Sequence, residues 1–219
     1  MASCITAQWS NSTTPQAKLT VTLNTNSSDG DTAVLDWVLE YVAHGYAANT
    51  SVTKSYSATI NGVTVASGKY DIDGKKSTHT IASGSVNIAK TTAAQTISFG
   101  LSFTFNLTWS DKYGGTKTAS GSISVPAKTK YTLTYNANGG TGAPASQTKW
   151  FGVGLVLSND VPTRTGYSFN NWALSKSEAD ANRWYYKPGS TCGRNENVTL
   201  YAVWVANTYA VRYDANGGT

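Results

Sequence analysis

Large apolar residues alternate with small polar residues along much of the first half of the chain. The longest such stretch runs from Ile97 to Trp109, where every second side chain is large and apolar. A period of two places these side chains on one face of an extended strand and the Ser, Thr, Gly and Asn residues on the other. The pattern predicts a half-buried antiparallel strand.

Shorter stretches of the same kind surround it. Lys18 to Leu23 alternates, Ser57 to Ala66 is interrupted by Asn61-Gly62, and Thr118 to Val125 follows a Gly-Gly turn at 113–116. Asn-Gly between two apolar runs is a strong signal for a two-residue β-hairpin. Short strands separated by turn residues predict a β-sandwich with an immunoglobulin-like or fibronectin-like arrangement.

Segment 33–46 fits two patterns. Val34 and Val38 would share one face of a helix, whereas Trp37 and Tyr41 would share one face of a strand. Aromatic and β-branched residues are frequent here, and they fit pleated surfaces. We therefore favour a strand.

The second half of the chain repeats itself. Tyr131 to Thr141 reads YTLTYNANGGT, and Tyr209 to Thr219 reads YAVRYDANGGT, 78 positions later. Similarity at a fixed spacing predicts an array of small modules. We expect one complete repeat and the first strand of a second, truncated one.

The Pro126 to Lys130 segment marks the predicted joint between domains, because Pro126 cannot donate to a β-ladder. We assign a sandwich to residues 1–127, a repeat to 128–206 and a truncated repeat to 207–219. Within the repeat, Ser175 to Asn182 is the best helical stretch.

Three motifs in the repeat carry a resemblance to a known family. They are YTLTYNANGGTGAP at Tyr131 to Pro144, PTRTGYSFNNW at Pro162 to Trp172, and VTLYAVW at Val198 to Trp204. In this order they resemble the Listeria-Bacteroides repeat, also called the internalin B-repeat. The resemblance implies a small β-grasp-like sheet with little helix, used as a stalk or spacer in surface and phage proteins.

The region 1–127 is similar to the amino-terminal domain of minor structural proteins of siphophages that infect Gram-positive bacteria. The shared features are Ser/Thr-rich strands, a DGKK turn at Asp73 to Lys76, and a SGSISVP strand that leads into the repeat. The resemblance implies a domain that docks on the virion, without a defined activity.

Composition and the first residues agree with a virion protein. Charged residues make up 13% of the chain, and the opening MASCITAQWSNSTT lacks the basic and apolar regions of a signal peptide. No apolar stretch approaches the roughly 20 residues of a membrane span. We expect assembly in the host cytoplasm and exposure on the particle surface, without membrane contact.

The net charge of +5 is spread over scattered basic residues, so the sequence does not favour nucleic-acid binding. Cys4 and Cys192 are far apart and are expected to be free thiols. His44 and His79 lack neighbours at metal-ligand spacing. We expect no metal site and no cofactor, and Asp29 to Asp31 and Asp71 to Gly74 fit turns better than calcium loops.

The sequence also argues against an enzyme. It contains no GxSxG, P-loop or HExxH motif. The sequence has no convincing paired carboxylates beyond Asp36 and Glu40, which would lie on the polar face of the strand and face solvent. A nucleophile, a base and a metal are therefore all lacking.

One aromatic cluster is a candidate glycan-binding site. Trp184, Tyr185 and Tyr186 are consecutive, and alternation would expose at least one of the three rings. Trp184 departs from the family pattern, so it either fills the core or contacts a ligand. Trp172 and Trp204 lie in the family motifs and are predicted to be core residues.

These observations lead to one expectation with two alternatives. We expect a non-enzymatic bacteriophage structural protein of the tail, the tail tip or the particle surface, multimeric in the particle, that presents a modular stalk for host attachment. Its partners would be other virion proteins, bound through the first strands, and a host cell-wall glycan. The alternatives are a carbohydrate-binding module and a bacterial surface adhesin.

Overall fold

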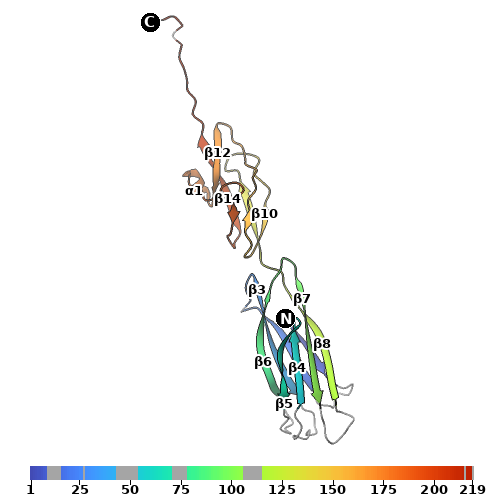
Figure 1. The fold of residues 1–219 in the computed structure, drawn as a ribbon. Helices are drawn as coiled ribbons and strands as arrows, with labels where there is room; N and C mark the ends of the chain where they lie inside the picture. Colours follow the sequence, from blue (N-terminus) through green and yellow to red (C-terminus); the bar gives the residue numbers. More distant parts are fainter. Residues whose placement is uncertain are drawn as a thin grey trace. The chain divides into compact units, whose positions relative to one another are not determined.

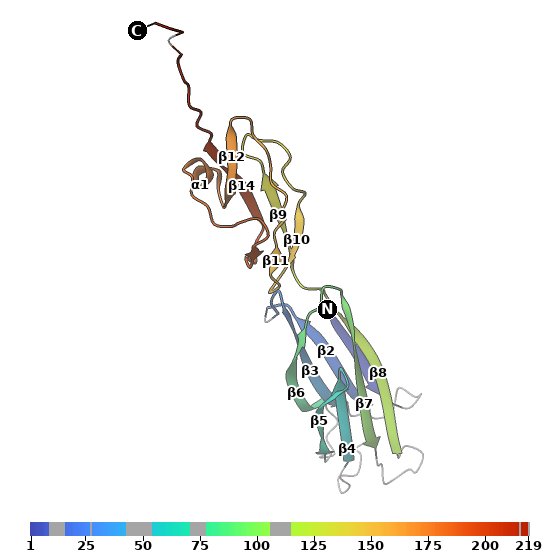
Figure 2. The same ribbon diagram turned by 45° about the horizontal axis from the view of Figure 1, so that its top comes forward.

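The computed structural model describes residues 1–8, 16–26, 28–42, 54–70, 78–105, 115–214 and 216–218. The described part is built almost entirely from β-strands (Figures 1 and 2). It forms two compact units, Met1–Lys128 and Thr129–Thr219. The all-β fold class predicted from the alternation is confirmed.

The first unit is a sandwich of two four-stranded antiparallel sheets. One sheet has the order β1 (Ala2–Ala7), β2 (Gln16–Asn24), β3 (Thr32–Val42) and β6 (Thr78–Ala89). The other has the order β5 (Val63–Tyr70), β4 (Lys54–Ile60), β7 (Gln95–Phe105) and β8 (Gly115–Val125). In an immunoglobulin-like sandwich, strands B and E are neighbours in one sheet, and strands C, F and G are neighbours in the other. The pair β3–β6 corresponds to B and E, and the set β4–β7–β8 corresponds to C, F and G.

Strand β3 shows how the alternating sequence builds the core. Its buried side chains occupy every second position from Ala33 to Tyr41, and Trp37 and Leu39 are among them. The strand interpretation of segment 33–46 is therefore confirmed up to Val42, and the positions after Val42 lie outside the described residues. Strand β7 follows the same rule, while positions 106–109 also lie outside the described part.

The polar face of β3 differs from the sequence-based expectation. Asp36 is half-buried and accepts hydrogen bonds from Asn24 Nδ2 at 2.7 Å and from Ser85 Oγ at 2.6 Å. Glu40 is also half-buried, with Lys18 Nζ 3.9 Å away. The two carboxylates therefore link neighbouring strands, because β2 and β6 flank β3 on both sides.

The predicted hairpin at Asn61-Gly62 is confirmed. The two residues join β4 to β5 with φ angles of 52° and 76°. Positive φ at both central residues is the requirement of a type I′ turn, which Asn-Gly meets with little strain.

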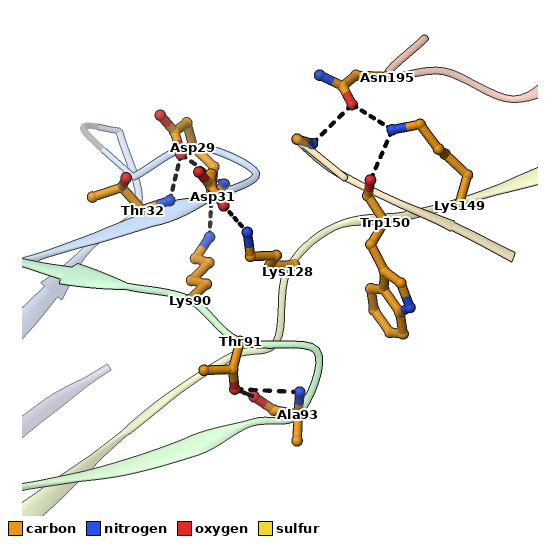
Figure 3. A network of polar contacts seen from close by, with 11 residues as sticks. Asp29, Asp31, Thr32, Lys90, Thr91, Ala93, Lys128, Lys149, Trp150 and Asn195 are labelled. Carbon is orange, nitrogen blue, oxygen red and sulfur yellow. Dashed lines mark hydrogen bonds and ion pairs between the residues drawn. The ribbon is translucent and has the colours of Figure 1, made fainter. Parts of the chain in front are cut away.

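Polar contacts hold the last residues of the sandwich (Figure 3). Lys128 forms an ion pair with Asp31, and its backbone N–H donates to the Thr91 carbonyl at 2.8 Å. Asp29 Oδ1 accepts the backbone N–H groups of Asp31 and Thr32, and these bonds lower the pKa of Asp29. The predicted turn at 29–31 is thereby confirmed, and segment 71–74 lies outside the described residues.

The second unit contains one mixed sheet with the order β10 (Gln147–Trp150), β9 (Lys130–Asn136), β14 (Val198–Ala206) and β12 (Tyr167–Ala173). The central strands β9 and β14 are parallel, and the outer pairs are antiparallel. A central parallel pair made by the first and last strands is the β-grasp arrangement. A short pair, β11 (Leu155–Val156) and β13 (Thr191–Cys192), adds to it.

The core of the repeat is aromatic and aliphatic. Trp172 is fully buried, with the Tyr135 ring 4.9 Å away and the Phe169 ring 5.1 Å away. Leu133 and Leu200 complete the centre of the cluster. The prediction that Trp172 is a core residue is confirmed.

The helix predicted at 175–182 is confirmed over a shorter range, as α1 (Lys176–Asp180). Ser175 is its N-cap, because its Oγ accepts the Glu178 N–H at 3.2 Å. The same hydroxyl lies 3.1 Å from the Glu178 carboxylate, to which it donates. The helix ends early because Asn182 adopts a φ of 54°. Within the described residues, no helix combines the length and apolar character that a membrane span requires.

Candidate functional site

The three motif segments of the repeat meet at one end of its sheet. Strands β9 and β14 run in parallel, and β12 runs antiparallel to β14. The end of β9, the start of β12 and the end of β14 therefore lie together. We call this the distal end, because β14 leads from it to the second copy of the opening motif.

Trp204 joins the first and last motifs. Its Nε1–H donates to the carbonyls of Ala137 at 3.0 Å and Asn138 at 3.1 Å, in the turn that follows β9. Trp204 is half-buried and packs against the core of the repeat, so the prediction that it is a core residue is confirmed only in part. The reason is the position of Trp204 near the end of β14, where the ring covers the turn of the opening motif.

Gly140 explains why the opening motif contains two glycines. Asn138 and Gly139 form the turn with φ angles of 47° and 86°. A Cβ atom at Gly140 would lie 2.5 Å from the Thr163 carbonyl oxygen and 2.5 Å from Trp204 Cζ2. Only glycine fits there, because real Cβ contacts are longer.

The middle motif closes the same end. Thr141 and Thr163 exchange two backbone hydrogen bonds, 2.8 and 2.9 Å long, which tie the segment before β12 to the segment after β9. Between these segments lies a shallow groove of about 820 Å³. We call it the distal groove and define it by Gly140, Val161, Arg164, Tyr167, Ser168 and Trp204.

One wall of the distal groove is charged and aromatic. The Arg164 guanidinium lies 3.9 Å from the centre of the Tyr167 ring, a cation–π contact. Arg164 and Tyr167 also line a smaller adjoining pocket with Asp180. A hydrogen bond from Lys176 holds the pKa of Asp180 below its usual value, with a further hydrogen bond from Asn138.

The groove also exposes apolar surface. Val161 is 42% exposed and Tyr167 is 37% exposed, although both belong to a segment that packs closely on the turn beneath it. We did not predict this surface from the sequence. Tyr167 lies in the middle motif, PTRTGYSF, and Val161 directly precedes it, so the motif marks this surface in the sequence.

The predicted aromatic cluster separates in the structure. Trp184 is 44% exposed and Tyr185 is 55% exposed, with Lys187 Nζ 5.8 Å from the Trp184 ring. Tyr186 is half-buried and packs against the repeat core, and burial raises its pKa. Trp184 is therefore not a core residue, which leaves its interpretation as a contact residue open to test.

The remaining candidates from the sequence are the two cysteines and the two histidines. Cys4 and Cys192 are free, as predicted, and Cys192 is buried. Among the described residues, no three His, Cys, Asp or Glu side chains are grouped closely enough to hold a metal ion. His44 lies outside the described residues.

Comparison with known protein families places a Listeria-Bacteroides repeat domain at residues 131–203. The resemblance seen in the three motifs is confirmed for this part of the chain. It covers about a third of the sequence. No solved structure matches the chain.

Two proteins of Evansella cellulosilytica are similar to parts of the chain. One, named "Putative Gly-rich membrane protein", is 30% identical over 107 residues, which is 48% of this chain and 12% of that protein. The other, named "Putative membrane protein", is 29% identical over 89 residues, which is 41% of this chain and 12% of that protein. The matched regions are thus small parts of much longer proteins.

Proposed function

We propose that this chain is a non-enzymatic spacer from a surface-associated protein. Its modules would hold a binding region away from the structure that anchors it. The observation that carries the proposal is the return of the opening motif at Tyr209, directly after a folded repeat. A repeat whose first and last strands are neighbours can be joined to further copies, as in other modular arrays.

Three further findings support a spacer. The repeat domain is of a type that indicates surface-associated proteins. The relatives are about eight times longer than the matched regions and are named as membrane proteins. In the described part of the chain, polar side chains cap a turn (Asp29), link strands (Asp36) and cap the helix (Ser175).

The anchoring structure could be a virion or a bacterial envelope. The sequence resemblance favours a phage tail or tail tip, with the sandwich bound to other virion proteins. The names of the relatives favour a bacterial surface, where the chain would be part of an adhesin. We propose the virion as the first location to test, and the envelope as the second candidate.

Immunogold electron microscopy with an antibody against residues 1–127 tests both locations. Label at a fixed position on purified particles is the result expected for a virion component. Label on the bacterial wall, with unlabelled particles, would move the proposal to an adhesin. Label confined to the cytoplasm would contradict a surface spacer of either kind.

A second candidate function is glycan binding at Trp184 and Tyr185. The observation in its favour is the exposure of both rings beside Lys187. Aromatic rings with an apolar face and a polar edge suit sugar rings. The Trp184→Ala variant should lose binding to purified cell-wall glycan in a sedimentation assay, while Tyr209→Ala, another exposed ring, should retain it. Equal glycan binding by the unmodified chain, Trp184→Ala and Tyr209→Ala would contradict this second candidate function.

A further inference from the structure

The chain leaves the distal end of the repeat through a joint made of a single residue. Strand β14 ends at Ala206, and Thr208 corresponds to Lys130, the first residue of β9, at the repeat spacing of 78. Only Asn207 lies between them. Two Cα steps span at most about 7 Å, so a repeat that begins at Thr208 must start in contact with the distal end.

Asn207 is bound to the repeat that precedes it. Its backbone N–H donates to the Gly166 carbonyl at 2.9 Å, and its Oδ1 accepts the Ser168 hydroxyl at 2.7 Å. Ser168 is also a residue of the distal groove. The joint is therefore fixed at the rim of the groove rather than left as a loose linker.

The segment after the joint, at 208–214, is not paired into a sheet with the described residues. Val211 is 72% exposed and Tyr213 is 92% exposed. Their counterparts in β9, Leu133 and Tyr135, are 1% and 6% exposed. These apolar positions are buried when a complete repeat surrounds them, so the motif indicates that a second folded module belongs at this place.

The opposite end of the repeat presents an apolar turn, at Trp150 to Val153, which we call the proximal turn. Val153 is 44% exposed, and the Phe151 N–H donates to the Thr129 carbonyl at 2.8 Å, beside the start of β9. Asn195 Oδ1 braces this turn, because it accepts the Gly152 N–H and the Lys149 ammonium, both at 3.0 Å (Figure 3). The Lys149 ammonium also donates to the Trp150 carbonyl at 2.8 Å.

We propose that the distal groove is the docking site for the next repeat, which places its proximal turn over Val161 and Tyr167. The inference rests on the proposed spacer function and adds the contact that would stiffen the spacer. A turn at one end and a groove at the other make a head-to-tail contact, and such contacts propagate along an open array. The one-residue joint brings the two surfaces together without a separate binding event.

The test extends the full chain at Thr219 with a second copy of residues 142–206. Because Thr219 corresponds to Thr141, this extension completes the second repeat. Hydrogen–deuterium exchange is compared between the 219-residue chain and the extended chain in peptides covering 161–168 and 204–209. We expect at least ten-fold slower exchange of these peptides in the extended chain.

Two substitutions in the first repeat separate docking from folding. Val161→Lys should remove the protection, because it places a charge in the groove. Val156→Lys is the matched control, since Val156 is 59% exposed and is not a residue of the groove. In the added copy, the substitution equivalent to Val153→Lys should also remove the protection, because it places a charge in the proximal turn of the second repeat. This change leaves the first repeat unmodified.

Each outcome decides the proposal. Protection that is lost with Val161→Lys and kept with Val156→Lys supports docking. Equal exchange in the two unmodified chains overturns it, as does protection that appears only when cell-wall glycan is added. None of these results depends on where the protein is located, so immunogold labelling tests the spacer function separately.

Discussion

Gly140 and Trp204 act as one unit at the scale of single residues. The indole N–H binds two carbonyls of the turn, and the absence of a Cβ at Gly140 lets the ring lie against the backbone. The opening and closing motifs therefore depend on each other, although 64 positions separate them.

Replacing Gly140 with Ala should destabilise the repeat by about 1–3 kcal/mol, the usual cost of overpacking. Gly193→Ala is the control, because a Cβ at Gly193 meets nothing within 4 Å and its φ is not positive. Urea unfolding followed by tryptophan fluorescence measures both. Equal midpoints for the two variants would contradict the packing argument.

Tyr135 couples the stability of the repeat to pH. Its hydroxyl donates to Gln147 Oε1 at 2.6 Å and accepts the Ser158 N–H at 2.9 Å, and burial raises its pKa. A raised pKa in the folded state means that the neutral form is favoured by folding. The stability should be complete below the unfolded pKa of about 10 and should fall as the pH rises through the folded value.

Tyr135→Phe should therefore reduce the loss of stability above pH 10. At pH 7 it should cost about 1–2 kcal/mol, because it leaves the Ser158 N–H and the Gln147 carbonyl without this partner. Urea unfolding at pH 7 and at pH 10.5 measures both effects. Tyr185→Phe, a change at an exposed ring, should leave both values as in the unmodified chain.

At the scale of elements, the long strands are stabilised by burial of their apolar faces, whereas the short helix depends on its N-cap. Helix α1 has five residues, too few to be stable by propensity alone. Ala179 is its buried residue and packs near Ala173 and Val203. The Ser175 cap and this contact together hold it.

Ser175→Ala should destabilise the repeat by about 1 kcal/mol through loss of the cap. Thermal unfolding followed by circular dichroism measures the shift. Ser146→Ala is a suitable control, since the Ser146 hydroxyl makes only a long, 3.5 Å contact with Thr134. A larger shift for Ser146→Ala than for Ser175→Ala would contradict the capping argument.

At the scale of the whole molecule, the two units have separate cores. The sandwich core is drawn from residues 5–125, and the main core of the repeat from residues 133–202. Leu39 and Leu133 are equivalent probes, because both are buried at the centre of their own cluster. We therefore expect the free energy of unfolding of each unit to depend on its own core.

Leu39→Ala should cost the sandwich about 2–5 kcal/mol, and Leu133→Ala should cost the repeat a similar amount. Hydrogen–deuterium exchange, read peptide by peptide in low urea, distinguishes the units. Each variant serves as the control for the other. Faster exchange in both units after either substitution would show that the cores are coupled.

The sequence by itself determined the features that depend on local geometry. The alternation of apolar and polar residues identified the buried faces of β3 and β7. The Asn61-Gly62 pair identified the hairpin between β4 and β5. The motif at 214–218 is the clearest case, because Asp214 Oδ1 accepts the Asn216 N–H at 2.8 Å just as Asn136 binds Asn138. This hydrogen bond joins residues only two positions apart, so it does not depend on segments distant in the sequence.

Only the tertiary structure decided which apolar residues are covered. Trp172 and Trp204 both lie on strands in the motifs of the repeat, yet Trp172 is fully buried and Trp204 covers a turn. Val211 and Leu133 occupy equivalent positions, yet only Leu133 has strands on both sides. Burial depends on segments distant in sequence, so no local pattern could predict the distal groove or separate Trp184 from Tyr186.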